Sequence, residues 1–511
     1  MQERERSPHI VWLMADQLRW DALGFTGNDI VRTPHLDRLA KSGVVFDNMF
    51  VQSPVCVSSR ACMLTSRYLR NLNMANSCPL LDPREVTIQE CLQRRGYRTG
   101  LFGKLHLTPQ LFTRDNLNST RPITDATPFL EAAGIPPIPS DPCKRNYGFQ
   151  HTVGFEDILW GEYLDWLVER HPDVATPMLQ DAPSDQEWTR ADFQKAFVTS
   201  QFPGGSLGDV GCMRIPAACH PSRFIAESAA EYFETHHAEA PCFMHVSFVD
   251  PHHPWDPPAE VAANYPPEDM PLPKHLECPL RWPPMLSDRA ANFSDVTHDM
   301  MRTTKANYYA MIETFDMAVG HLIHRIEAAG ELDNTVFVFV ADHGELLGDF
   351  GLFRKGSYHF DSMIRTPCFI SAPGQIPGGR RIPELVESVD ITPTLLGLAN
   401  MPVHEGMQGI NMADDLRQGG SVGREYTYTD MFTTPNGPYV SCQTLRTRDA
   451  KLNFYPEDNV GMLFDLSADP DECHDLWDDP THRELRMQMT GLMLHAQYEH
   501  RSPLPRVISQ F

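Results

Sequence analysis

Two apolar segments of the chain end in carboxylates, and a histidine follows one of them. Asp16 comes directly after the apolar run 9–15, and Asp342 with His343 comes directly after the run 335–341. An aspartate in such a place can simply cap a helix or form a turn. In an open α/β sheet, however, ligands bind at the carboxyl ends of the strands. Carboxylate oxygens suit a hard cation such as Ca²⁺, Mg²⁺ or Mn²⁺, so these residues form a candidate cation site.

The segments that must position these side chains have the pattern of a βαβ sheet. Runs 9–15 and 335–341 are continuously apolar, which is typical of strands buried on both faces. Residues 33–43 have a Thr cap, a Pro at the first helical position and a closing Gly, which predicts a short helix. A helix followed by a strand is expected over 88–103, a strand over 242–248 and a long helix over 303–329. This alternation predicts an α/β fold.

The chain divides into two expected regions. We expect a catalytic domain over residues 1–400 and a smaller α+β subdomain with a terminal tail over 401–511. Within the first, residues 108–239 are rich in Pro, Asp and Trp and are expected to form a substrate-shaping insert. Trp160, Tyr163 and Trp166 in this insert could line a site for a quaternary ammonium group. Their helical spacing favours core packing instead.

Composition excludes several functional classes. The 511 residues carry a net charge of −24, which would repel a nucleic acid. No apolar stretch approaches the ~18 residues of a membrane helix, and the charged N-terminal segment does not resemble a signal peptide. We therefore expect a cytoplasmic protein without a membrane partner. The twelve cysteines contain no CxxC pair, so most should be buried or incidental thiols and no disulfide framework is expected.

Six motifs occur in a fixed order along nearly the whole chain. Residues 53–68, SPVCVSSRACMLTSRY, resemble the sulfatase signature Cys-x-Pro-Ser-Arg, in which the Cys is oxidised to formylglycine. The preceding residues 33–50, TPHLDRLAKSGVVFDNMF, also match that family. The other motifs lie at 103–107, 250–255, 341–344, 354–355 and 463–472. The chain is thus similar to sulfatases, and most similar to the branch of choline-sulfatases and phosphonate monoester hydrolases.

This resemblance implies a fold, a cation site and a set of roles. It implies an alkaline-phosphatase-like α/β fold, with a large mixed sheet between helices and a smaller C-terminal α+β subdomain. One divalent cation would be bound by Asp16, the modified Cys56, Asp342 and His343. Arg60 would hold the formylglycine hydrate, and Lys104 and Lys355 the sulfuryl oxygens. His106 and His252 would transfer protons.

The expected mechanism depends on the second hydroxyl of an aldehyde hydrate. After attack by the hydrate at position 56, deprotonation of its other hydroxyl expels sulfate and restores the aldehyde, which a thiol cannot do. His252 is expected to protonate the leaving group and His106 to assist the elimination. We assign the acid to His252 rather than His253 because His252 directly follows Pro251, as in the family pattern.

Three positions depart from the usual sulfatase pattern. Ser58 stands where Pro or Ala is usual, which affects recognition of Cys56 by the formylglycine-generating enzyme. Gln17 replaces a second carboxylate, and His343 replaces an Asn. The last two changes, together with the sequence of residues 351–367, resemble the choline-sulfatase and phosphonate monoester hydrolase branch. With an imidazole and two carboxylates as ligands, Ca²⁺ is the first candidate and Mn²⁺ the alternative.

The leading hypothesis is a sulfuric ester hydrolase acting on a small anionic ester. A phosphonate monoester or phosphodiester hydrolase could use the same site, but Lys104 and His106 match the Gly-Lys-x-His motif of sulfatases. An unmodified, weakly catalytic anion-binding relative is the third possibility, because of Ser58. The tail 502–511 ends in apolar residues after two prolines, and we expect it to pack across the subunit interface of a dimer or tetramer.

Overall fold

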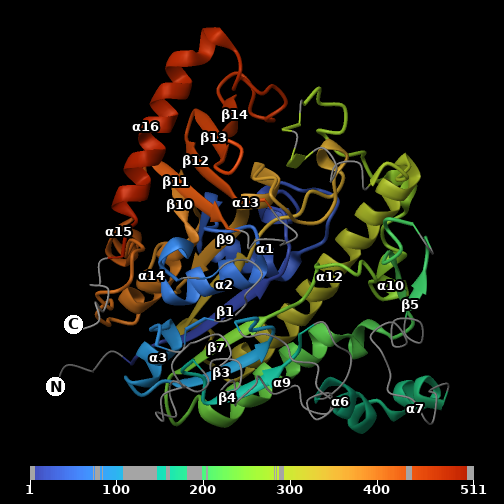
Figure 1. The fold of residues 1–511 in the computed structure, drawn as a ribbon. Helices are drawn as coiled ribbons and strands as arrows, with labels where there is room; N and C mark the ends of the chain where they lie inside the picture. The colour runs from blue at the N-terminus through green and yellow to red at the C-terminus, as the bar shows by residue number, and fades with distance from the viewer. Residues whose placement is uncertain are drawn as a thin grey trace, which may run out of the picture.

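A large mixed β-sheet forms the centre of the molecule. The computed structural model describes residues 6–502 apart from 73, 75–80, 83, 108–146, 157–161, 181–197, 203–204, 281, 284, 287–292 and 433–439. In these residues eight strands pair in the order β10-β2-β9-β8-β1-β7-β3-β4 (Figure 1). In chain order they are β1 (His9–Ala15), β2 (Val44–Phe50), β3 (Arg98–Gly103), β4 (His151–Gly154), β7 (Cys242–Ser247), β8 (Thr335–Ala341), β9 (Arg365–Ser371) and β10 (Arg380–Glu387).

The middle of the sheet is parallel and fully buried. Strands β8, β1, β7 and β3 are parallel neighbours, whereas β9 runs antiparallel to both β8 and β2. Every residue of β1 and β8 is buried, as their continuous apolar runs predict. The predicted strands at 9–15 and 335–341 are confirmed residue for residue.

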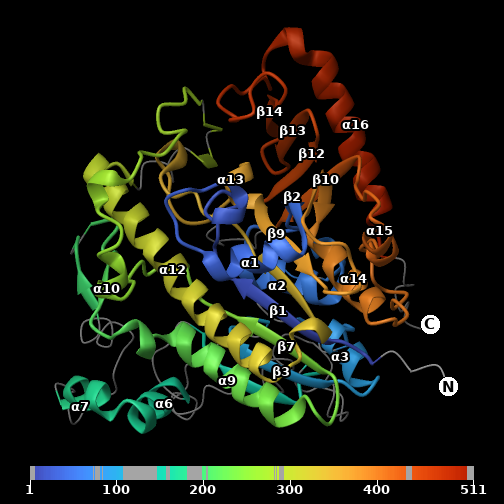
Figure 2. The same cartoon turned by 180° about the vertical axis from the view of Figure 1, so that it is seen from behind.

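Helices cover both faces of the sheet, so successive residues of β1 belong to two different cores. Ile10, Trp12 and Met14 belong to the core under α2 (Cys56–Thr65), α3 (Ile88–Gln93) and α14 (Ile391–Leu398). Val11 and Leu13 belong to the core under α1 (Pro34–Ser42), α9 (Pro221–His236) and α12 (His298–Ala328). Figures 1 and 2 show α9 and α12 together on one side of the sheet. The predicted α/β fold with a large mixed sheet between helices is confirmed.

The other described elements, apart from those of the C-terminal sheet and its helix, are short. They are α6 (Glu162–Arg170), α7 (Pro172–Gln180), β5 (Val198–Ser200), β6 (Gly211–Met213), α10 (Ala259–Ala262), α13 (Asp361–Ile364) and α15 (Ala413–Gln418), with 3₁₀ turns at Gly24–Thr26, Leu69–Asn71, Ala217–Cys219, Pro267–Asp269, Leu332–Asn334, Asp349–Gly351, Ser388–Asp390 and Pro480–His482. None of the described helices has both the length and the apolar character needed to cross a membrane.

The predicted insert at 108–239 contains core elements as well. Strand β4 pairs with β3 at the sheet edge, and α9 covers β3 and β7. Tyr163 is fully buried and its ring lies against Trp166 and Phe224, so core packing is confirmed for Tyr163. Trp166 is half-buried and packs against the same core. Trp160, and the residues 108–146 and 181–197 of the insert, lie outside the described residues. The substrate-shaping role of this insert stays a prediction.

A second, smaller sheet forms the C-terminal part, as expected. Strands β11 (Tyr426–Met431), β12 (Cys442–Thr447), β13 (Ala450–Tyr455) and β14 (Val460–Asp465) form an antiparallel meander covered by α16 (Arg483–Glu499). Most cysteines in the described chain are free thiols, as predicted, but Cys278 and Cys473 form a disulfide. The tail beyond Ser502, which we expected at a subunit interface, lies outside the described residues.

Candidate active site

Four neighbouring parallel strands bring the candidate residues to one edge of the sheet. Asp16 follows β1, and Asp342 with His343 follows β8. Lys104 follows β3, and His252 lies in the loop after β7. Because these strands are parallel and adjacent in the order β8-β1-β7-β3, the loops after them converge above the same edge.

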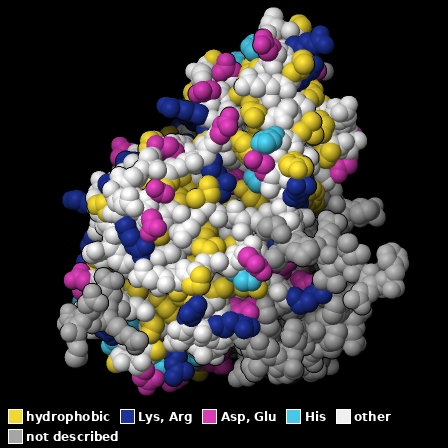
Figure 3. Space-filling view, turned by 90° about the vertical axis from the view of Figure 1, so that its left-hand side faces the viewer, with side chains coloured by type: hydrophobic (Ala, Val, Ile, Leu, Met, Phe, Trp, Pro, Cys, Tyr) yellow, Lys and Arg dark blue, Asp and Glu magenta, His cyan; other side chains and the backbone are white. Residues whose placement is uncertain are grey.

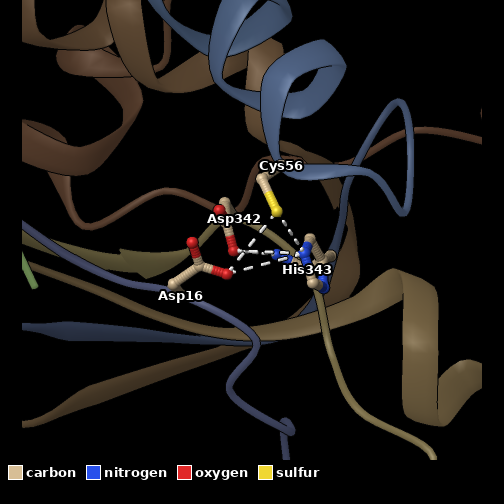
Figure 4. Close-up of side chains that lie close together, drawn as sticks. All are labelled: Asp16, Cys56, Asp342 and His343. Atoms are coloured by element: carbon tan, nitrogen blue, oxygen red, sulfur yellow. Dashed lines mark hydrogen bonds and ion pairs between the residues drawn. The ribbon is translucent and has the colours of Figure 1, made fainter. Parts of the chain in front are cut away.

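A buried cluster occupies this edge. The ligand atoms of Asp16, Cys56, Asp342 and His343 all lie within 4.8 Å of one another, and all four residues are buried (Figure 4). Cys56 is the first residue of α2, so the positive end of that helix faces the cluster. Its Sγ lies 3.2 Å from His343 Nε2 and 3.7 Å from Asp16 Oδ1.

Arg60 holds both carboxylates from one helical turn further along α2. Its Nε donates to Asp342 Oδ2 at 2.8 Å, and its Nη2 donates to Asp16 Oδ2 at 3.2 Å. Its Nη1 donates to the Lys104 carbonyl and to Ser247 Oγ, at 2.8 and 2.7 Å. The guanidinium has no exposed surface, so these bonds fix Arg60 between the two strand ends.

Two lysines make the site positive despite the acidic chain. Lys104 Nζ lies 2.8 Å from Asp16 Oδ2, and Lys355 Nζ donates to Cys56 Sγ at 2.5 Å. Burial would raise the pKa of the Cys56 thiol, but Lys355 and His343 lower it well below its usual value. The surroundings of position 56 therefore stabilise a negative charge.

The two histidines expected to transfer protons lie near position 56. His252 Nε2 is 3.1 Å from Lys355 Nζ, and its Nδ1 donates to the His253 carbonyl at 2.5 Å. The His106 side chain hydrogen-bonds Cys56 and helps to lower the pKa of the thiol. Glu156 Oε1 accepts the backbone N–H groups of Leu105 and His106 at 3.0 and 2.8 Å, which positions this loop. The structure thus gathers every residue that the sequence proposed for the site.

Comparison with known proteins decides the family. The Sulfatase family model matches residues 8–401, and the model of the N-sulphoglucosamine sulphohydrolase C-terminal region matches residues 348–499. The chain belongs to the sulfatase family.

Individual relatives agree with this assignment. An arylsulfatase of Clostridium perfringens is 27% identical over 93% of this chain and 92% of its own length. The choline-sulfatase of Rhizobium meliloti is 26% identical over 93% and 83%. The solved phosphonate monoester hydrolase of Agrobacterium radiobacter has the same fold, with a TM-score of 0.77 and 23% identity over 97% of this chain and 96% of that one.

The donor set of this sulfatase fits a divalent cation. His343 Nδ1 donates to the Gly344 carbonyl at 2.8 Å, so the lone pair of Nε2 is directed at the cluster. That Nε2 lies 3.7 Å from one oxygen of Asp16 and 3.7 Å from one oxygen of Asp342. Two carboxylates and one imidazole nitrogen are suitable ligands for Ca²⁺ or Mn²⁺.

A second layer of the sulfatase site was not found from the sequence. Gln17 has a left-handed backbone (φ 63°) and its N–H donates to Asp342 Oδ1 at 3.0 Å. Its side-chain Nε2 donates to Glu345 Oε2 at 2.5 Å and lies 3.1 Å from His253 Nδ1. The His253 ring stacks on His252 with centroids 4.2 Å apart. Glu345, two residues after His343, was the available sign of this layer in the sequence, but the sequence alone does not show what Glu345 contacts.

Proposed function

We propose that this sulfatase hydrolyses sulfate monoesters with a formylglycine made from Cys56 as its nucleophile. The observation that carries the proposal is the setting of Cys56. It lies at the N-terminus of α2, in contact with Lys355 and His343 and close to Asp16. An oxygen at this position would have a cation site on one side and an ammonium group on the other.

Asp16, Asp342 and His343 would hold one divalent cation, together with the modified residue 56. When bound, the cation supplies a positive charge that acidifies a hydroxyl group and attracts a sulfuryl oxygen. Ca²⁺ is the first candidate and Mn²⁺ the alternative. Lys104 and Lys355 would bind the sulfuryl oxygens. Arg60, which donates to both carboxylates, would hold the formylglycine hydrate.

His252 is our candidate for the acid that protonates the leaving group. Because its Nδ1 already donates to a carbonyl, its Nε2 is the atom that can exchange a proton in the site. Lys355, 3.1 Å from that Nε2, is the neighbouring proton donor. His106 is our candidate for the base that assists release of sulfate, because it contacts residue 56 directly.

Modification of Cys56 is tested by chemistry specific to aldehydes. Protein made in a host with a formylglycine-generating enzyme should react with a hydrazide and give the matching mass of the peptide containing residue 56. Cys56→Ala should abolish turnover and hydrazide labelling while the fold is kept. Cys62→Ala is the matched control, because Cys62 is a buried free thiol in the same helix. Full activity from protein with only a free thiol at position 56 would refute the proposal. Unmodified protein that binds a sulfate ester without hydrolysing it would support the anion-binding relative instead.

A phosphonate monoester or phosphodiester hydrolase is the second candidate, supported by the shared fold with the Agrobacterium enzyme. The Lys104–Asp16 ion pair, at 2.8 Å, supports the sulfatase assignment because it fixes the lysine of the Gly-Lys-x-His motif in the site. We expect kcat/KM for an aryl sulfate to exceed that for the matching aryl phosphonate. A higher value for the phosphonate would replace our proposal with this alternative.

A further inference from the structure

Helix α16 carries a row of exposed apolar side chains. Its buried side, with Met489, Met493 and Ala496, faces the C-terminal sheet. On its outer side Met487, Leu494 and Tyr498 are 65%, 63% and 61% exposed. Figure 3 views the molecule from the side on which α16 lies and shows hydrophobic side chains gathered along it. So large an exposed apolar row on one helix indicates an interaction surface.

The row has the spacing of a coiled-coil seam. Residues 487, 491, 494 and 498 follow one another in steps of four, three and four, as the a and d positions of a heptad do. Gly491 stands between the large residues, and a Cβ there would meet no atom within 4 Å. We call these four residues, with Glu484 and Arg501 at the next steps of three, the α16 seam.

The two ends of the α16 seam carry opposite charges. Glu484 and Arg501 are both exposed. The Arg501 guanidinium lies 3.9 Å from the centre of the Tyr498 ring and donates to its hydroxyl at 2.8 Å. This contact keeps the charge on the same side of the helix as the apolar row.

We propose that the α16 seam binds the α16 seam of a second copy of this chain, in antiparallel orientation about a two-fold axis. In that register Glu484 faces Arg501 of the second copy, and the two-fold axis repeats the pair. Met487 faces Tyr498, and Leu494 faces the open space at Gly491. Each layer then joins an a position to a d position, as antiparallel pairing of two heptads requires.

The charges select this arrangement over a parallel one. Parallel pairing would place Glu484 against Glu484 and Arg501 against Arg501, and like charges in facing positions are destabilising. It would also place Gly491 against Gly491 and leave that layer without a side chain. A single helix pair lies at the small end of specific interfaces, so the dimer should dissociate on dilution.

Sedimentation velocity of the full chain over a concentration series tests the seam. We expect the wild type to move from monomer to dimer, and Met487→Glu/Leu494→Glu to stay monomeric with its melting temperature and sulfatase activity unchanged. Met317→Glu is the matched control, because Met317 is 47% exposed on α12 and outside the seam. A wild type that is monomeric throughout, or a double variant that still dimerises, would overturn the proposal.

Charge exchange tests the register. Glu484→Arg alone, and Arg501→Glu alone, should each weaken dimerisation by about tenfold or more, because each puts like charges in two facing pairs. The double exchange Glu484→Arg/Arg501→Glu should restore it. Failure of the double variant to recover would rule out the antiparallel register. A dimer that is lost when residues 503–511 are deleted, but kept in Met487→Glu/Leu494→Glu, would assign the interface to the tail instead.

Discussion

At the scale of single residues, the hydrogen bonds within the site decide which side-chain atoms can take part in the proposed reaction. The Nδ1 of His252 is used by a carbonyl, so the proposed acid can act only through Nε2. We expect His252→Ala to lower kcat/KM by ~10²-fold or more for an alkyl sulfate and much less for nitrophenyl sulfate, because a stable phenolate needs no general acid. His253→Ala is the control. Equal losses on both substrates would assign His252 to binding.

Asp342 is the residue through which cation binding should be most visible. It faces His343 Nε2 and also accepts from Arg60 Nε, so removal of one negative charge weakens the cation site directly. Chelation should lower both the activity and the melting temperature of the wild type, because it leaves two buried carboxylates without the cation. Asp342→Asn should bind the cation at least about tenfold more weakly and show a smaller melting shift with chelator than the wild type. Wild-type rate in exhaustively demetallated protein would refute the site.

At the scale of elements, a carboxyl group of α12 caps the N-terminus of the neighbouring helix α1. Asp316 of α12 accepts the backbone N–H groups of His35 and Leu36, at 3.2 and 2.9 Å, in the first turn of α1. This attachment holds α1 against α12 on one face of the sheet. Burial raises the pKa of Asp316 to about 7, although the two backbone bonds act against the shift.

This carboxyl group should make stability depend on pH. Between pH about 4 and 7 the folded chain keeps the Asp316 proton while the unfolded chain has lost it, so folding takes up a proton. Stability should therefore fall as pH rises through this range. Asp316→Asn has no carboxyl group to titrate at this position. Urea unfolding should therefore show its free energy of unfolding rising relative to that of the wild type as pH increases, by roughly 1 to 4 kcal/mol. Asp299→Asn, an exposed change on the same helix, is the control, and parallel pH profiles for wild type and Asp316→Asn would contradict the prediction.

At the scale of the whole molecule, the C-terminal part is tied to the catalytic part by a covalent link. The Cys278–Cys473 disulfide joins residues 195 positions apart, with their Cα atoms 5.0 Å from each other. His275 and Asp471 make a second contact there, with His275 Nε2 3.3 Å from a carboxylate oxygen. A disulfide is rare in a reducing cytoplasm, so this pair weighs against the cytoplasmic location, which stays a prediction.

Closing so long a loop should stabilise the fold by restricting the unfolded chain. Cys278→Ser should lower the melting temperature by about 2 to 5 °C in the absence of reductant. Dithiothreitol should lower the wild type to the same value and leave the variant unchanged. Cys212→Ser, at a free half-buried cysteine, serves as the control. A wild type insensitive to reductant would show that the link does not form.

The amino-acid sequence was enough to predict the central strands and to name the candidate residues of the site. Continuous apolar runs are sufficient to define β1 and β8, and each motif is local enough to be found without a fold. Which distant residues meet depends on the three-dimensional fold. Lys355 reaches Cys56 across 299 positions because the first residue of α2 and the loop after β8 lie at the same edge of the sheet. The contacts of Gln17 with Glu345 and His253, and the Cys278–Cys473 link, likewise depend on strand order and chain crossings, which leave no periodic trace in a linear sequence.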